Sequence, residues 1–195
     1  MIKVAIVYHS GFGHTKVQAE AVATGAQSVD GVEVVLMTAT DACERIDELD
    51  NADAIVFGSP TYMGNVAAEM KRFMEVAASK WFAQAWKDKI AGAFTNSSSF
   101  SGDKLNTLVS LMINAMQHGM IFVSLGMFPA ADNMDSMKSV EGPGPEVLNR
   151  VESFIGPMAA SFQVDAGTAP PAGDIETARL YGVRIAEITT RYKSG

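Results

Sequence analysis

Short apolar runs rich in β-branched residues alternate along this chain with longer segments in which apolar residues recur at helical intervals. The runs occupy residues 2–8, 32–37, 54–58, 90–95 and 120–125. Runs of roughly four to eight such residues are typical of strands that are buried in a sheet. The pattern therefore predicts five strands.

The segments between these runs predict amphipathic helices. Their apolar residues lie three or four positions apart, which places them on one face of a helix that can cover a sheet. The clearest stripes consist of Val66, Met70, Phe73, Met74 and Ala77, and of Leu105, Leu108, Met112, Ile113 and Met116. A last helix, which Asp174 can cap, carries the small residues Ala178 and Gly182 one turn apart, and these allow a close approach to the sheet.

The alternation of strands and helices predicts an α/β fold with a doubly wound, five-stranded parallel sheet, because parallel strands need crossover helices on both faces. We expect the strand order 2-1-3-4-5 and one domain over residues 1–195. Periodicity is lost around 126–173, where Pro, Gly and Asp/Asn are frequent, so this stretch predicts an irregular insertion. Within it we expect a short helix over 146–155 and a segment over 161–164 that completes the fifth strand.

The loop after the first strand is the most informative one. Residues 8–15 read Tyr-His-Ser-Gly-Phe-Gly-His-Thr and lead directly into a helix. Backbone N–H groups at a helix N-terminus, together with the hydroxyls of Ser10 and Thr15, can bind the oxygens of a phosphate. The loop therefore predicts a phosphate site, with an ordinary turn rich in Gly and Ser as the alternative.

The composition of this loop narrows the ligand. A Walker-type NTP loop needs Gly-Lys-Ser/Thr, which is absent here, and a dinucleotide loop needs a third glycine where Lys16 stands. It also needs an acidic residue where Met37 and Thr38 end the second strand. Flavin mononucleotide (FMN), with one terminal phosphate, fits best. The candidate cofactor-binding residues of this loop are Ser10, Gly11, Phe12, Gly13, His14 and Thr15.

The loops after the third and fourth strands should lie at the same edge of the sheet, because the carboxyl ends of parallel strands share one edge. Pro60 and Gly64 shape a turn that presents Tyr62 and Met63, which can cover a flavin ring. The small polar residues of the later loop can bind the polar edge of the ring, although they also suit a solvated helix cap. The candidate cofactor-binding residues are Pro60, Thr61, Tyr62, Met63 and Gly64, and Asn96, Ser97, Ser98, Ser99, Phe100 and Ser101.

Gln117 and His118 directly precede the fifth predicted strand and are the candidate catalytic residues. Either side chain can polarise the carbonyl of an electron acceptor if it reaches the crevice. A histidine at a helix end more often interacts with exposed backbone carbonyls, so that reading stays open. The three histidines show no spacing typical of metal ligands, and we expect no metal site.

Charge and cysteine content bound the function further. The formal net charge is −7 and no basic cluster is present, which argues against nucleic acid and anionic membrane surfaces as partners. No apolar run reaches the roughly 18 residues needed to span a bilayer, and no separate signal segment precedes the first strand, so we expect a cytoplasmic protein. Cys43 is the single cysteine, and redox chemistry therefore needs a cofactor.

With these three loops, the chain resembles the WrbA-type NAD(P)H:quinone oxidoreductases, a flavodoxin-like family that binds FMN, over nearly its whole length. The residues that carry the resemblance are those of the runs 10–15 and 59–65, Met70, Phe73, His118, Gly119, Met120, Ala178 and Gly182. The resemblance implies FMN as cofactor and NAD(P)H as co-substrate. It also implies that Phe12 lies where nicotinamide enters and that Trp81 borders a substrate pocket completed between protomers of a tetramer.

Three departures from the family bear on the acceptor and on assembly. The family carries a His-His pair where this chain has Gln117 and His118, and a glycine-rich loop where it has residues 96–101. The Pro/Gly-rich stretch 142–145 is longer than usual, which leaves the tetramer open, and we expect a homo-oligomer that is either a dimer or a tetramer.

We expect an enzyme that transfers two electrons from NAD(P)H to a quinone-type acceptor by alternating use of one pocket. The same fold serves electron carriers of the flavodoxin type and FMN-binding modules without catalysis, and both remain alternatives.

Overall fold

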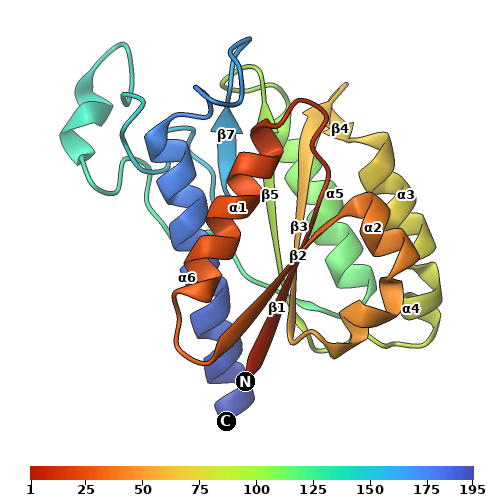
Figure 1. The fold of residues 1–195 in the computed structure, drawn as a ribbon. Coiled ribbons are helices and arrows are strands. Elements are labelled where there is room, and N and C mark those ends of the chain that lie inside the picture. The colour runs from red at the N-terminus through yellow and green to blue at the C-terminus, as the bar shows by residue number, and fades with distance from the viewer.

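A twisted parallel sheet forms the middle layer of the computed structural model, which describes all 195 residues (Figure 1). Its long strands follow the order β2-β1-β3-β5, and a short strand, β4, pairs antiparallel with the end of β3. The strands are β1 (Ile2–Tyr8), β2 (Val32–Thr38), β3 (Ala54–Tyr62), β4 (Asn65–Val66), β5 (Ile90–Ser97), β6 (Ile121–Phe122) and β7 (Met158–Ala160).

The fifth position of the sheet is filled by two separate strands. β6 pairs with Ile90 and Ala91 at the start of β5, and β7 pairs with residues 95–97 at its end, both in parallel. The predicted doubly wound order 2-1-3-4-5 is thus confirmed, with β5 as the fourth strand and β6 and β7 together as the fifth. The prediction that 161–164 completes this strand is wrong, because the pairing with β5 uses 158–160 and the chain turns away after Ser161.

A tyrosine from the last helix occupies the gap between these two strands. The fully buried Tyr181 hydroxyl accepts a hydrogen bond from the Ala93 N–H (3.4 Å) and donates one to the Val123 carbonyl (2.6 Å). Ala93 lies in β5 between the residues that pair with β6 and those that pair with β7. The hydroxyl therefore satisfies backbone groups that a continuous fifth strand would otherwise pair.

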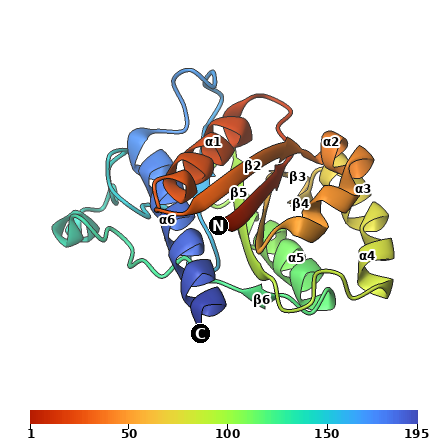
Figure 2. The ribbon, with the colours of Figure 1, turned by 60° about the horizontal axis from the view of Figure 1, so that its bottom comes forward.

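Helices cover both faces of the sheet (Figures 1 and 2). One face carries α1 (His14–Gln27) and α6 (Ala172–Ser194). The other carries α2 (Ala39–Glu44), α3 (Ala68–Val76), α4 (Ala78–Phe82) and α5 (Lys104–Gln117), and the 3-10 helix η1 (Ile46–Asn51) follows α2. None of the helices combines the length and the apolar character needed to cross a bilayer.

Each face of the sheet has its own apolar core, because successive side chains of a strand point to opposite faces. In β3, Val56 packs with Phe94 and Ile185 on the α1/α6 side, whereas Phe57 packs with Phe73 on the other. Each fully buried side chain of this size contributes about 1.5–3 kcal/mol. The two cores hold the strands in register and so fix the positions of the loops at their carboxyl ends.

Two glycines bring α1 and α6 into close contact. A Cβ atom on Gly182 would lie 2.0 Å from the Val22 carbonyl oxygen of α1, and one on Gly25 would lie 1.8 Å from the Arg179 carbonyl oxygen of α6. Neither position has space for a side chain.

Between β6 and β7 the chain makes a long excursion whose only helix is η2 (Met134–Lys138). Part of it projects from the body of the molecule (Figure 1). The predicted helix over 146–155 is wrong. This stretch consists of turns, because Asn149 and Glu152 have positive φ angles (46° and 58°) and the Asn149 side chain bonds the backbone of Ser153.

Candidate functional site

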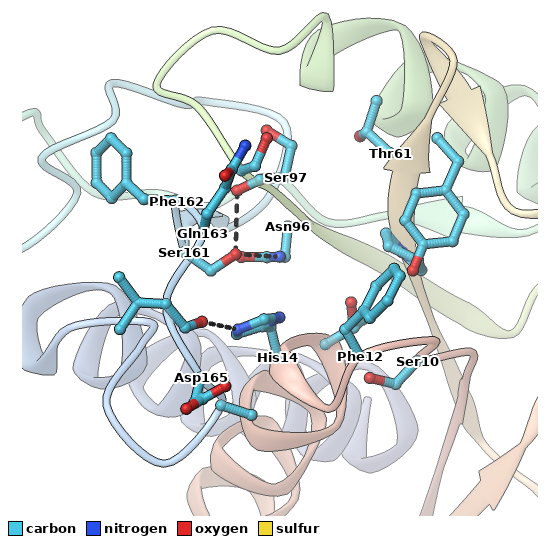
Figure 3. A pocket seen from close by; sticks show the side chains of 16 residues that line it. Ser10, Phe12, His14, Thr61, Asn96, Ser97, Ser161, Phe162, Gln163 and Asp165 are labelled. Carbon is cyan, nitrogen blue, oxygen red and sulfur yellow. Dashed lines mark hydrogen bonds between the residues drawn. The ribbon is translucent and has the colours of Figure 1, made fainter.

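A pocket of about 470 Å³ lies at the carboxyl ends of β1, β3, β5 and β7 (Figure 3). This is the edge where doubly wound sheets bind ligands. Parts of all three predicted loops meet here. The lining residues are Ser10, Phe12, His14, Thr15, Pro60, Thr61, Tyr62, Asn96, Ser97, Ser98, Ser161, Phe162, Gln163, Val164, Asp165 and Ala166.

The N-terminus of α1 supplies hydrogen-bond donors at one end of the pocket. Gly13, with φ at 91°, turns the chain into the helix, and the backbone N–H groups of His14 and Thr15 make no hydrogen bond within the chain. The Thr15 side chain is 2% exposed and lines the pocket, and its hydroxyl also has no partner in the chain. The Ser10 hydroxyl accepts from the Lys16 N–H (3.1 Å), which leaves its own proton to donate. These groups suit an anion.

His14 forms part of the pocket wall. Its Nε2 lies 2.6 Å from the Val164 carbonyl oxygen, and because a carbonyl only accepts, this nitrogen carries the proton (Figure 3). The contact ties the loop after β1 to the loop after β7. A Cβ atom on Gly13 would lie 2.8 Å from Ala166 Cβ, so the two loops also approach closely.

Two aromatic rings form the opposite wall. Phe12, 77% exposed, meets Tyr62 edge to face with ring centroids 6.2 Å apart. A Cβ atom on Gly11 would lie 2.4 Å from the Tyr62 hydroxyl oxygen, so glycine at position 11 leaves room for the ring. Burial raises the pKa of Tyr62, and its phenol stays protonated at neutral pH. The wall offers an apolar, open surface for a planar ligand.

Polar side chains of β5 and the loop after β7 form the third side. The Asn96 amide bonds the Ser161 hydroxyl (3.0 Å), as Figure 3 shows. Ser97 and Ser98 also line the pocket. The Thr61 hydroxyl contacts those of Thr95 (2.9 Å) and Thr107 (2.8 Å), so it holds the loop after β3 in place.

Sequence comparison identifies the family. The sequence model for the NADPH-dependent FMN reductases matches residues 26–133, more than half of the chain. This chain belongs to that family. The WrbA-type resemblance is confirmed by a solved relative within the flavodoxin-like fold. That structure, a flavodoxin, WrbA-like protein from Agrobacterium tumefaciens, is 38% identical, covers 98% of this chain and 99% of its own, and has a TM-score of 0.74.

Two curated relatives match this chain over nearly its whole length. Flavodoxin FldP of Pseudomonas aeruginosa is 41% identical in an alignment that covers 96% of this chain and 97% of that protein. An NAD(P)H dehydrogenase (quinone) of Syntrophobacter fumaroxidans is 32% identical in an alignment that covers 97% of this chain and 98% of that protein. One relative thus has the name of an electron carrier and the other that of an enzyme.

FMN, which gives the FMN reductase family its name, fits the residues of this pocket. The donors without partners at His14 and Thr15 suit its phosphate, and the wall of Phe12 and Tyr62 suits a flat ring. The amide and hydroxyls near Asn96 suit polar ring atoms. The pocket therefore has one group of each kind that FMN requires.

Several of the predicted cofactor-binding residues do not line the pocket. Gly11 and Gly13 shape the first loop, because a Cβ atom at either position would lie too close to Tyr62 or Ala166. Met63 has a positive φ angle (48°), and its side chain is fully exposed and does not enter the pocket. The other predicted residues that do not line the pocket are Gly64, Ser99, Phe100 and Ser101.

Gln117 and His118 lie at the other edge of the sheet. They end α5 and precede β6, which pairs with the first residues of β5, so they lie where the parallel strands begin. Within one chain neither side chain reaches the crevice, because a residue that precedes a parallel strand lies opposite its carboxyl end. His118 is 3% exposed and packs on Trp86 with ring centroids 4.6 Å apart. Burial lowers the pKa of His118, which keeps the ring neutral.

Trp81 is also separate from the pocket within one chain. It lies on α4, 43% exposed, with its ring 4.6 Å from that of Phe82.

Sequence reasoning missed the loop 161–166, which contributes six lining residues. A loop directly after a parallel strand is expected to line the pocket. The apolar residues of 161–164 favour a strand instead, so the sequence does not reveal this loop. Reasoning also missed Lys104, whose Nζ donates to the Ser97 hydroxyl (2.8 Å) and to the Ser99 carbonyl behind the polar side of the pocket.

Proposed function

We propose that this protein binds FMN in the pocket and transfers two electrons from NAD(P)H to a quinone-type acceptor. The observation that carries the proposal is the joint presence of phosphate donors at the start of α1 and an open aromatic wall at Phe12 and Tyr62. The relative named NAD(P)H dehydrogenase (quinone), which matches the whole chain, supports it.

We assign the phosphate to the N–H groups of His14 and Thr15 and the hydroxyls of Ser10 and Thr15. The ring is assigned to the loop with Pro60, Thr61 and Tyr62, and its polar edge to Asn96, Ser97 and Ser98. Bound FMN would supply the capacity to accept and release a hydride equivalent. The chain holds the group, excludes water from its buried side and leaves the side near Phe12 open to a second ring.

Phe12 is 77% exposed, so one side of the pocket is open to solvent, and we propose that NAD(P)H and the quinone both enter from this side. NAD(P)H and the quinone would therefore use the same place in turn, which predicts ping-pong kinetics. No residue that lines the pocket is needed as an acid or base for hydride transfer itself.

A second candidate function is electron transfer to a protein partner. The relative named flavodoxin is 41% identical over nearly the whole chain, which favours this alternative. A carrier of this kind takes up single electrons and does not oxidise NAD(P)H directly. Anaerobic reduction in single-electron steps, without direct oxidation of NADH or NADPH, would indicate the carrier.

We further propose that the chain forms a homodimer or homotetramer in which Trp81 borders the pocket of a neighbouring copy. The exposed pair Trp81 and Phe82 supports this, since large exposed aromatic side chains are enriched at interfaces. Light scattering of the wild type and of Trp81→Ala measures the assembly. A monomeric wild type would contradict it.

The test of the proposed function is one absorbance experiment in a single cuvette. The purified protein with FMN should show a bound-flavin spectrum, lose its visible absorbance when NADH or NADPH is added without oxygen, and regain it with benzoquinone. Free FMN at the same concentration is the control. Failure to retain FMN at saturating ligand would contradict the proposal, and bound FMN that is not reduced by either nicotinamide would favour the carrier.

A further inference from the structure

A buried lysine lies directly behind the polar side of the pocket. Lys104, the first residue of α5, has 0% exposure. Its ammonium donates to the hydroxyl of Ser97 (2.8 Å), which lines the pocket, and to the carbonyl of Ser99. One hydroxyl therefore separates a positive charge from the space that the ligand would occupy.

The loop between β5 and α5 is shaped to enclose this ammonium. Gly102 and Asp103 both have positive φ angles (53° and 54°), which turn the chain back over the residues that precede them. A Cβ atom on Gly102 would lie 2.3 Å from the Ser97 hydroxyl oxygen. The Ser97 hydroxyl also bonds the Ser99 carbonyl (3.1 Å), so the loop and the lysine form one connected unit.

The charges around Lys104 do not cancel. Arg150 and Asp174, from the excursion and from α6, form a buried pair with N–O distances of 2.8 and 3.1 Å. The Asp174 carboxylate also accepts from the Ala160 N–H (2.9 Å). Asp103 and Glu152, which border the same region as Lys104, are exposed to water. Two buried cations thus face one buried anion.

A buried excess of positive charge is costly unless an anion comes close. Burial accordingly lowers the pKa of Lys104 to about 8, although Asp174 acts in the opposite direction. Asp174 of α6 and Arg150 are the charged groups that face the lysine from the interior. β5 and the loop after it contact the ammonium through the Ser97 hydroxyl and the Ser99 carbonyl, and Asp103 of that loop is exposed.

We propose that Lys104 is a positioning residue that holds the Ser97–Ser99 loop and stabilises the negative charge that FMN acquires on reduction. The inference rests on the proposed function. Hydride transfer from NAD(P)H moves two electrons and one proton to the flavin ring and leaves NAD(P)⁺. The ring therefore gains one negative charge unless a further proton follows. Lys104 raises the affinity for reduced over oxidised FMN, and hence the midpoint potential.

The experiment compares the FMN midpoint potential of the wild type, Lys104→Met and Lys104→Arg between pH 6 and 10, together with FMN dissociation constants. Lys89→Met is the matched control. Lys89 also has a pKa lowered by burial and donates to the backbone carbonyls of Asp50 (2.8 Å) and Ala52, but it precedes β5 at the opposite edge of the sheet.

At pH 7 we expect Lys104→Met to reduce the preference for reduced FMN on the order of tenfold, which is about 30 mV for a two-electron couple. The difference from the wild type should vanish as the pH rises beyond the range in which Lys104 loses its proton. Lys104→Arg, with a permanent charge, should keep the higher potential there, and Lys89→Met should follow the wild type throughout.

Weaker FMN binding in Lys104→Met with an unchanged potential would overturn the inference and reduce Lys104 to a structural support. If Lys104→Met does not fold, the comparison of wild type with Lys104→Arg at high pH decides, and equal potentials overturn the inference. A wild type that does not bind FMN overturns the proposed function and this inference with it, whereas bound FMN with equal potentials in all variants overturns this inference alone.

Discussion

Replacement of Thr15 by valine removes one hydroxyl from the phosphate end of the pocket and leaves the rest of the fold unchanged. The Thr15 side chain is 2% exposed and its hydroxyl makes no hydrogen bond within the chain. Valine has nearly the same shape, and no partner in the protein loses a bond. We therefore expect the free energy of unfolding without ligand to stay the same or to rise, because valine removes a buried hydroxyl that has no partner in the chain.

The expected loss of affinity follows from the charge of the phosphate. A hydrogen bond to a charged group contributes about 1.5–3 kcal/mol, which is roughly 10- to 150-fold in a dissociation constant. The N–H groups of His14 and Thr15 remain in Thr15→Val, so we expect the lower part of this range for FMN. Riboflavin has the same ring but no phosphate, and its affinity should stay the same.

The assay is quenching of flavin fluorescence on titration with protein, with FMN and riboflavin in parallel. The control is Thr24→Val on the same helix, where the hydroxyl donates to the Glu20 carbonyl (2.9 Å) and faces away from the pocket; its affinity for FMN should equal that of the wild type. An equal loss for FMN and riboflavin in Thr15→Val, or no loss for either, would refute the assignment of the phosphate to this end.

Three further predictions concern stability, each measured by urea unfolding. Gly182→Ala should lower the free energy of unfolding by about 1–3 kcal/mol or more, because its Cβ would meet the Val22 carbonyl at 2.0 Å; Gly144→Ala, with nothing within 4 Å, should have little effect, and equal effects would contradict the close contact of α1 and α6. Arg150→Met should cost about 3–5 kcal/mol, because it leaves Asp174 buried without its partner, whereas the exposed pair of Arg179 and Glu176 should contribute less than about 1 kcal/mol; a cost that small at Arg150 would disprove the importance of the buried pair. Because burial lowers the pKa of His118, the unfolded state binds more protons as the pH falls below about 6.5, so stability should decrease there and decrease less in His118→Phe; identical pH profiles would exclude His118 as the cause.

The periodicity of the sequence predicts the parts of the fold in which local pattern and burial agree. Buried strands such as β1 and β3 contain apolar runs, at 4–7 and 54–57, and α5 carries a clear stripe. The position of the pocket follows from the alternation of these elements, because parallel strands end at one edge. Thr15 and Tyr62 could therefore be assigned to the pocket from sequence alone.

The fifth strand could not be predicted correctly, because its second part is defined by pairing and not by composition. Met158, Ala159 and Ala160 include no β-branched residue, yet they pair with the end of β5 in the structure. The run 161–164, with Phe162 and Val164, has the higher strand propensity but lies beyond the partner strand. Tertiary pairing decided against local preference, and the loop 161–166 was missed for this reason.

The distance of Gln117 and His118 from the pocket of the same chain has a different cause. Gln117 and His118 are close to a strand in the sequence, but they precede it, and the ligand site lies at the other end of that strand. In a parallel sheet, the residues before a strand and those after it lie at opposite edges. Closeness to a strand in the sequence therefore does not place a residue at the edge that holds the pocket.

The Tyr181 bridge between β6 and β7 has a consequence for how this protein can evolve. Because a hydroxyl from α6 closes the gap in the sheet, the segment between the two strands can lengthen, shorten or be exchanged while the pairing of β5 is kept. The pocket wall formed by 161–166 follows β7, and Asn96 and Ser97 belong to β5, so both sides of the pocket lie outside that segment. Natural selection can thus change the length of that segment while both sides of the pocket stay in place.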